Sequence, residues 1–368
     1  MTRQVRLISG ILAGLFIVSA AASAQDARLH GYEHLEPAKP LFKADTVSML
    51  IIGDVMMHSR QMEYPFGPFL ENISGRMKAA DLAVVNMEFT LAGKPYTGYP
   101  AFSAPDAYAD YIRDCGANIF LTANNHILDK GAAGLKRTMQ IYRSMEENGE
   151  IRFTGTSADA EDNAKRYPLM VNAGGIRLAL VNFTYGTNIG GGDGWPKVDR
   201  MRRDEISQAL TRAKRELADF IIVLPHWGVE YELHHSPSQE SLAGWLVSHG
   251  ADAVVGAHPH VVQDSTVISG VPVFYSLGNA VSNMSAPNTQ LELAVELKFV
   301  LSENGDRSML PPAVTYLWCS LPGYFTDSYA TIAVKDFIGR RSMWKNPSDY
   351  DKMISTYRRV KSETGIQD

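Results

Sequence analysis

Short runs of apolar residues recur along the chain, and five of them are followed at once by polar side chains that can bind metals or protons. These five groups are Gly53-Asp54, Asn86-Met87-Glu88, Asn124-Asn125-His126, His226-Trp227-Gly228 and His258-Pro259-His260. Each apolar run is short enough for a buried strand. Because ligands bind at the carboxyl ends of strands in open α/β sheets, the pattern predicts one functional site built from five strand ends.

The remaining hydrophobic pattern predicts strands that alternate with helices. Predicted strands cover 47–54, 82–86, 117–122, 178–183, 221–224, 254–255, 271–276 and 291–300. Predicted helices cover 73–80, 107–114, 134–148, 205–218 and 238–249, with Asp204 expected to cap the fourth and Ser236 or Ser238 the fifth. The alternation favours α/β layers and a mainly parallel sheet. The last strands follow one another without long helices, which indicates a second sheet or antiparallel edges.

Two glycine-rich stretches interrupt this pattern. Residues 92–105 are rich in glycine, proline and tyrosine and predict a loop. Residues 186–194 hold a second cluster of glycines, but no Gly-Lys-Ser/Thr follows, so this is not a phosphate-binding loop. We expect it to form a mobile rim of the pocket.

The start of the chain is typical of a removable export signal. Arg3 and Arg6 precede an apolar stretch over 7–22, and Ala22-Ser23-Ala24 fits a signal peptidase site. We expect residues 1–24 to be a signal peptide, cleavage to leave no transmembrane anchor, and the protein to be secreted or periplasmic. An uncleaved anchor is the alternative, although the apolar run is short for a membrane span. Residues 25–46 predict an extended lead-in.

Composition and charge narrow the class of protein. A hydrophobic content of 45% suits a globular chain with a sizeable core. We expect one domain over 47–309 and a C-terminal cap, 310–368, that packs on the core. The net charge of −5 argues against nucleic acid as a partner. Cys115 and Cys319 could pair in an exported protein, but two cysteines are no framework, and Cys115 fits a small buried residue.

Taken alone, each candidate side chain has an ordinary structural role. Asp54 could cap a loop, and Glu88 could form a surface ion pair. Asn125 with His126 could form a turn, and His226 could be a buried structural histidine. Several such coincidences at strand ends are far less plausible together than one shared site. The pattern therefore favours a site for divalent metal.

The kind of ligand bears on the metal. His258 and His260 flank Pro259 and can present two imidazoles to one centre. Imidazole suits Zn, Fe and Mn, whereas carboxylates also suit harder ions such as Ca. We therefore expect one or two divalent ions, with Mn, Zn, Fe and Ca left open.

Six stretches together follow the motif order of a known superfamily. They are Gly53-Asp54-Val55-Met56, Val85-Asn86-Met87-Glu88, Leu121-Thr122-Ala123-Asn124-Asn125-His126, His226-Trp227-Gly228-Val229-Glu230-Tyr231, residues 250–261 and Tyr275-Ser276-Leu277-Gly278-Asn279. In this order the chain resembles the calcineurin-like metallophosphoesterase superfamily. Within it, the chain resembles the CapA family of capsule-synthesis, or poly-γ-glutamate synthesis, proteins. The resemblance covers about residues 47–300.

The resemblance implies a metallophosphatase-like, four-layer α/β/β/α sandwich and a role for each candidate. Asp54 and His260 would bind a first metal, Glu88 would bridge, and Asn125, His226 and His258 would bind a second. His126 would act as general acid or contact phosphate. Glu230 could be a further acid, base or outer partner, or simply a surface carboxylate.

One position departs from the superfamily, which usually has a histidine two residues after the first aspartate. Met56 stands there, and a thioether is a poor ligand for Mn, Mg or Ca. The first metal site is therefore weakened, altered or lost. His58 is the nearest substitute, but Met56 fits a core residue better.

The function expected from this resemblance is metal-dependent hydrolysis of a phosphoester or amide in an envelope polymer, with His126 and Glu230 as catalytic groups. An anionic or peptide-like polymer, such as poly-γ-glutamate, would be the partner, along with capsule assembly proteins. The alternative is a non-catalytic accessory protein that keeps the metal for structure. A third reading is a peptide epimerase that uses the same metal site.

Overall fold

A computed structural model describes residues 45–368. The predicted signal peptide and all but the last two residues of the lead-in lie outside this part of the chain. Across residues 45–368, no helix combines the length and the apolar character that a membrane span requires.

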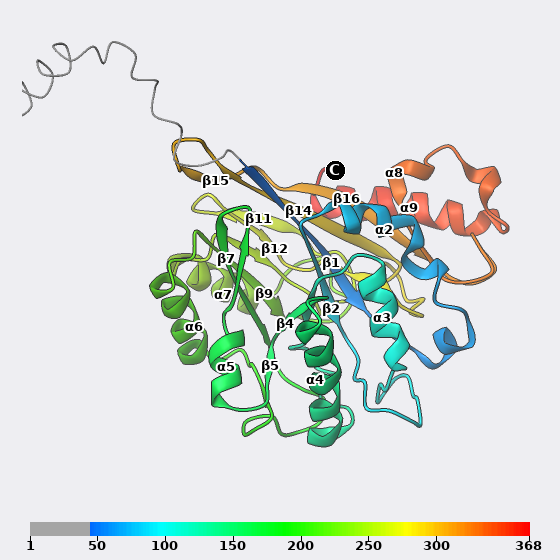
Figure 1. The fold of residues 1–368 in the computed structure, drawn as a ribbon. Coiled ribbons are helices and arrows are strands. Elements are labelled where there is room, and N and C mark those ends of the chain that lie inside the picture. Colours follow the sequence, from blue (N-terminus) through cyan, green and yellow to red (C-terminus); the bar gives the residue numbers. More distant parts are fainter. Residues whose placement is uncertain (1–44) are drawn as a thin grey trace, which may run out of the picture.

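The larger sheet has nine strands, with β1 near its centre (Figure 1). Its order is β17-β16-β14-β1-β2-β3-β4, with β13 beside β1 and β15 beside β14. The run from β1 to β4 is parallel, whereas β14, β16 and β17 are antiparallel. The strands are β1 (Asp45–Val55), β2 (Leu82–Met87), β3 (Ile119–Leu121), β4 (Arg152–Thr154), β13 (Asn279–Val281), β14 (Leu291–Leu301), β15 (Arg307–Met309), β16 (Ala313–Ser320) and β17 (Ala330–Ala333).

The second sheet has six strands in the order β11-β12-β10-β9-β7-β6. Its centre is parallel, and both of its edge pairs are antiparallel. The strands are β6 (Leu169–Ala173), β7 (Ile176–Thr184), β9 (Phe220–His226), β10 (Ala253–Val255), β11 (Ser265–Ile268) and β12 (Val271–Phe274). A small ribbon joins β5 (Thr156–Ser157) to β8 (Lys197–Val198). The expected second sheet and antiparallel edges are thus both present.

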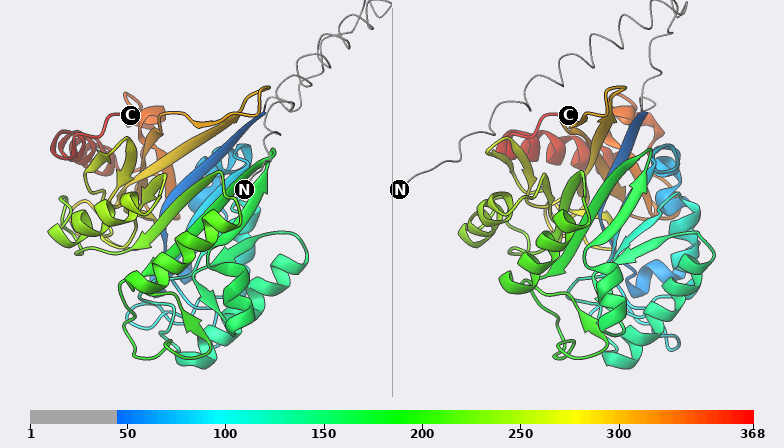
Figure 2. Two further views of the ribbon diagram at one scale, coloured as in Figure 1. Left: turned by 90° about the vertical axis from the view of Figure 1, so that its left-hand side faces the viewer. Right: turned by 60° about the vertical axis from the view of Figure 1, so that its left-hand side comes forward.

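Helices cover the outer faces of the two sheets. Figures 1 and 2 show α6 and α7 outside the six-stranded sheet, and α2, α3 and α4 outside the nine-stranded one. The helices are α2 (Pro68–Ala79), α3 (Asp106–Asp114), α4 (Gly131–Glu147), α5 (Ala160–Arg166), α6 (Arg203–Arg215), α7 (Pro237–Ser248), α8 (Val334–Phe337) and α9 (Pro347–Thr364), with 3-10 turns at Ser59–Glu63 and Arg341–Met343. This arrangement confirms the predicted four-layer α/β/β/α sandwich.

Three hydrophobic cores hold the four layers together, and β1 contributes to two of them. Val47, Met49 and Ile51 alternate along the strand and pack between the sheets. Ile52 and Val55 pack on the other side, among α2, α3 and α4. The register between β1 and β2 shifts between Ile52 and Asp54. The third core lies between the six-stranded sheet and α6 and α7.

The C-terminal segment both extends the larger sheet and covers part of it. Strands β16 and β17 form that sheet's antiparallel edge. Trp344, Tyr357 and Val360, from the segment around α9, pack with Trp318 of β16 in the same core that fills the space between the sheets. The aromatic residues near the end of the chain thus cover the antiparallel edge of the nine-stranded sheet, where β16 and β17 lie, and exclude water from it.

Local details correct one prediction and settle two alternatives. Asp204 does not cap α6, because the helix already begins at Arg203, and Asp204 lies in its first turn, where a negative charge still favours the helix. Ser236, not Ser238, caps α7, since its hydroxyl accepts a hydrogen bond from the Gln239 backbone N–H at 3.3 Å. Cys115 and Cys319 are buried free thiols and form no disulfide.

Asp199, just after β8, gives a test of the fold's response to pH. Burial raises the pKa of this carboxyl to about 7, although Lys197 and the Asn163 amide oppose the shift. A raised folded-state pKa means that stability is greatest below about 3.8, the unfolded-state value, and is lost as pH rises through about 7. Asp199→Asn should remove this loss and gain a few kcal/mol over wild type at pH 8, about 1.4 kcal/mol per pKa unit. Urea unfolding of both proteins at pH 5 and pH 8 measures this difference in the free energy of unfolding. The same change between the two pH values in wild type and variant would contradict the prediction.

Candidate metal centre

The carboxyl ends of parallel strands from both sheets meet in one place. Asp54 lies at the end of β1 and Glu88 just after β2, while His226 is the last residue of β9. The predicted ligands and His126 are each no more than 3% exposed: Asp54, Glu88, Asn125, His126, His226, His258 and His260. The structure therefore brings together the six predicted ligands and one of the two predicted catalytic residues.

Asp54 is positioned by an unusually close backbone approach. Its N–H donates to the Gly278 carbonyl at 2.9 Å. A Cβ on Gly53 would lie 2.0 Å from that same carbonyl oxygen, so only glycine fits before Asp54. The two carboxylate oxygens accept hydrogen bonds from Asn86 Nδ2 at 2.6 Å and from the His258 backbone N–H at 3.2 Å. Asp54 thus ties β1, β2 and the β10 end together.

Glu88 occupies the middle of the cluster. Its Oε1 lies 3.8 Å from His226 Nε2 and 3.9 Å from His260 Nε2, so it stands between histidines that follow different strands. The side chain is fully buried, and neither carboxylate oxygen has a hydrogen-bond partner. Burial, then Asp54 and Glu230, raise the pKa of Glu88 well above its usual value. A buried carboxylate without partners is costly, and a bound cation would remove that cost.

Neighbouring amides hold two of the imidazoles. His260 Nδ1 lies 2.9 Å from Asn279 Oδ1, which leaves its Nε2 directed at Glu88. His226 Nδ1 lies 3.2 Å from Asn86 Nδ2, which leaves its Nε2 facing Asn125 Oδ1 at 2.8 Å. Such polar partners fix ring orientation and tautomer in metal sites. Asn279 therefore orients a predicted ligand, His260.

The electrostatic environment keeps two imidazoles neutral. Burial, followed by the neighbouring His258 and His260, lowers the pKa of His226 well below its usual value. Burial and His260 lower the pKa of His258 to about 3. Burial also acts to lower the pKa of His260, but its interaction with Asp54 outweighs this and raises it. The neutral imidazoles of His226 and His258 are in the form that binds metal ions.

The backbone at the two histidines after β10 is strained. His258 has φ of 104° and His260 has φ of 57°, values that are uncommon for residues with a side chain. Each such conformation costs on the order of 1–3 kcal/mol and persists only when surrounding contacts hold it. Here Asp54 holds the His258 backbone and Asn279 holds the His260 ring. These backbone conformations bring the two imidazoles into one group with Glu88.

The donors fit a divalent metal ion. Glu88, His258 and His260 each offer one ligand atom, and these atoms all lie within 4.8 Å of one another. Asp54 Oδ2, 3.4 Å from His260 Nδ1, extends this group on one side. His226 extends it as well, because its Nε2 lies 3.8 Å from Glu88 Oε1. A mixture of imidazole and carboxylate donors suits Zn, Fe or Mn.

Met56 packs in a hydrophobic core, and His58 does not belong to the donor group in which all ligand atoms lie within 4.8 Å of one another. Met56 is 2% exposed in the core beneath the helices, which confirms its prediction as a core residue. His58 Nδ1 lies 3.0 Å from Gln61 Oε1, and its ring packs edge-on against Phe102. Burial lowers the pKa of His58 to about 4. His58 therefore does not take the place of Met56 in the donor group of Glu88, His258 and His260.

His126 lies beside the donors and forms a pair that the sequence analysis missed. Its Nδ1 lies 2.7 Å from Asp129 Oδ2, and both side chains are buried. The same Asp129 oxygen accepts a hydrogen bond from the Phe102 N–H at 2.8 Å, and the Phe102 ring packs edge-on against His126. Asp129 therefore fixes the imidazole. The spacing of three residues between them was the available signal.

Further polar residues that support the site come from distant parts of the sequence. Asn188, from the glycine-rich loop, places its Nδ2 3.3 Å from His126 Nδ1, so this loop does lie at the rim. Glu292 of β14 accepts a hydrogen bond from the Gly53 N–H at 2.7 Å, and burial raises its pKa to about 8. Glu230 is exposed in the loop after β9, outside the buried cluster.

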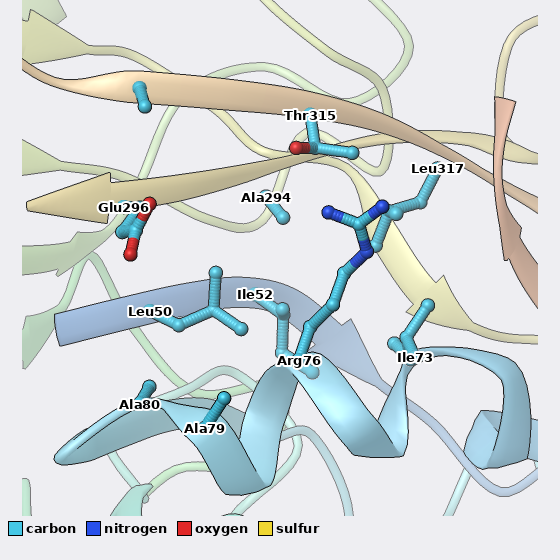
Figure 3. A pocket seen from close by; sticks show the side chains of 11 residues that line it. Leu50, Ile52, Ile73, Arg76, Ala79, Ala80, Ala294, Glu296, Thr315 and Leu317 are labelled. Atoms are coloured by element: carbon cyan, nitrogen blue, oxygen red, sulfur yellow. The ribbon is translucent and has the colours of Figure 1, made fainter. Parts of the chain in front are cut away.

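A cavity of about 210 Å³ lies elsewhere, between α2 and strands β14 and β16. Figure 3 shows Arg76 reaching from α2 across apolar side chains toward Thr315, with Glu296 at the other end. None of the predicted ligands lines this cavity. It is separate from the metal centre.

Comparisons with known proteins match the part of the chain that carries these residues. The profile of the family described as "Bacterial capsule synthesis protein PGA_cap" matches residues 48–284. The capsule biosynthesis protein CapA of Bacillus anthracis is 28% identical over 276 residues, 71% of this chain and 65% of that protein. The PGA biosynthesis protein CapA of Bacillus subtilis (strain 168) is 27% identical over 290 residues, 73% of this chain and 71% of that protein. The match thus spans just under two thirds of the B. anthracis relative.

Two more distant similarities were found. A probable polyglutamine synthesis accessory protein of Mycobacterium tuberculosis (strain H37Rv) is 26% identical over 242 residues, 60% of each chain. A putative 5'-nucleotidase from Staphylococcus aureus is 13% identical, with 73% of this chain and 54% of that chain covered, at a TM-score of 0.49, too low to carry an argument. The family profile, in contrast, covers more than half of the chain, from β1 to just beyond β13. The chain therefore belongs to the bacterial capsule synthesis family PGA_cap.

Proposed function

We propose that this protein is an exported, divalent-metal-dependent hydrolase of capsule or envelope polymer metabolism, acting on phosphoester or amide bonds. The observation that carries the proposal is Glu88. It is a buried carboxylate with two unpartnered oxygens, set between His226 and His260. The export part rests on the signal sequence, with Ala22-Ser23-Ala24 as its cleavage site.

The positions of the residues support a role for each of them in this reaction. Asp54, Glu88, Asn125, His226, His258 and His260 would hold the metal. When bound, a divalent ion supplies Lewis acidity and an activated water at neutral pH. His126, held by Asp129 at 2.7 Å, would give a proton to the leaving group. Exposed Glu230 would act at the rim on substrate rather than as a ligand.

A non-catalytic role has one observation in its favour. The M. tuberculosis relative is named an accessory protein of polyglutamine synthesis. In this role the metal would stabilise the fold, and the protein would bind an anionic or peptide-like polymer or the capsule assembly proteins. The buried His126–Asp129 pair favours catalysis instead, because a structural metal does not need an oriented proton donor beside it.

A turnover assay separates these two roles. Purified protein is loaded separately with Mn²⁺, Zn²⁺, Fe²⁺ or Ca²⁺ and incubated with a phosphomonoester, a phosphodiester and a γ-glutamyl oligomer. We expect one metal to support hydrolysis of at least one substrate, and Asp54→Asn to abolish it. Turnover by none of the metal–substrate pairs, with metal bound, would contradict the hydrolase and support the accessory role.

A further inference from the structure

Tyrosines cover the buried donors. The ligands are 3% exposed or less, whereas Tyr99, Tyr185 and Tyr231 are 71%, 43% and 47% exposed. They come from three different loops, those after β2, β7 and β9. Large apolar side chains that are exposed together mark binding surfaces.

Each of these tyrosines contacts a histidine of the site. The Tyr185 ring centre lies 4.6 Å from that of His258. Tyr231 lies 6.3 Å from His260, and Tyr99 lies 6.3 Å from His126. A substrate that binds next to these histidines and extends toward solvent would therefore contact the tyrosine rings.

The backbone holds two of the tyrosines in place. The Tyr185 N–H donates to the His226 carbonyl at 2.9 Å. The Tyr231 N–H donates to the Pro259 carbonyl at 2.9 Å, and Tyr231 has φ of 68°, a conformation that costs energy for a bulky residue. The rings are thus anchored to the same segments that carry the ligands, which favours a preformed surface over random exposure.

We propose that Tyr99, Tyr185 and Tyr231 form a stacking platform that binds a ring with an apolar face, such as a sugar or a nucleobase, carried next to the bond that is hydrolysed. Aromatic side chains bind such rings through their faces. Exposed Glu230 and Glu232 stand beside Tyr231 and can accept hydrogen bonds from ring hydroxyls, whereas their charge opposes a polycarboxylate. The position of the reacting bond rests on the proposed function, but the platform itself does not.

Binding of matched phosphates tests the platform without turnover. Uridine 5′-monophosphate and glucose 6-phosphate each carry a ring, and glycerol 3-phosphate is an acyclic monoester of equal charge. Calorimetry measures the affinities of the three phosphates for Ca²⁺-loaded protein. A second series measures the affinities of the uncharged analogues, uridine, methyl glucoside and glycerol, for metal-free protein. We expect at least one ring compound to bind about 10-fold tighter than its acyclic match, and Tyr185→Ala or Tyr231→Ala to remove that advantage.

Matched variants make the result specific. Tyr185→Phe and Tyr231→Phe should keep the advantage, because the ring face remains. Tyr96→Ala, an exposed tyrosine of the loop that carries Tyr99, should have no effect. A preference for uridine compounds assigns a nucleobase, and a preference for glucose compounds assigns a sugar. The proposal would be overturned if ring and acyclic compounds bind equally well, or if the advantage of the ring compounds persists in both alanine variants. Tighter binding of tri-γ-glutamate than of any ring compound would also overturn it. Loss of turnover alone would affect only the proposed function.

Discussion

Glu88→Gln is expected to weaken metal binding by at least about 100-fold and, at the same time, to stabilise the metal-free protein. Loss of a supporting group around a metal costs 10–100-fold in affinity, and Glu88 lies among the donors themselves. Without metal, any charge on this carboxyl group is buried with no partner. Glutamine has nearly the same size but removes this charge.

The stabilisation should depend on pH. Because burial raises the folded-state pKa of Glu88, the metal-free wild type loses stability as pH rises above about 4.5, the unfolded value. The gain from Glu88→Gln should therefore grow from pH 5 to pH 8. Thermal unfolding with a chelator and with Mn²⁺ measures both effects, and Glu232→Gln, at an exposed carboxylate, is the control. If Glu88→Gln melts at a lower temperature than wild type in chelator and binds metal with unchanged affinity, the account is contradicted.

His126→Ala should lower turnover by about 10²–10⁴-fold, the usual contribution of a general acid, and leave metal affinity unchanged. The ring lies beside the donors but is held by Asp129. Asp129→Asn should cause a smaller loss, because the imidazole remains but loses the charge that orients it. Hydrolysis rates and metal affinity are measured on the same preparations, with His234→Ala, a largely exposed histidine, as control. A fully active His126→Ala protein would exclude the proton-donor role.

Several long elements were predictable because their apolar positions repeat, but α9 and β16, in the segment predicted only as a cap, were not assigned. The β1 pattern places Val47, Met49 and Ile51 on one face, and the helices on either side of β3 were found within a few residues. Very short elements have no repeat to detect, and β4, β5 and β8 were missed for that reason. Helix α5 was missed because its sequence, Ala160–Arg166, has no apolar face.

The sequence predicted only those residues of the candidate site that lie at the ends of strands. Parallel strands collect their last residues at one edge, so Asp54, Glu88 and His226 could be grouped from the sequence. Distances across the two sheets have no local signal, and neither do contacts from remote loops. Asn188 and Glu292 were missed for this reason, since each is polar within a stretch typical of a loop or of an ordinary strand.

The metal content of the mature protein, from residue 25 on, tests the central claim most directly. Wild type and His226→Ala are equilibrated separately with Mn²⁺, Zn²⁺, Fe²⁺ and Ca²⁺, freed of unbound ion, and analysed for bound metal per chain. We expect wild type to retain one or two ions of at least one metal and His226→Ala to retain fewer. No retained metal in wild type under any of these conditions would contradict the metal centre, and with it the hydrolase that depends on it.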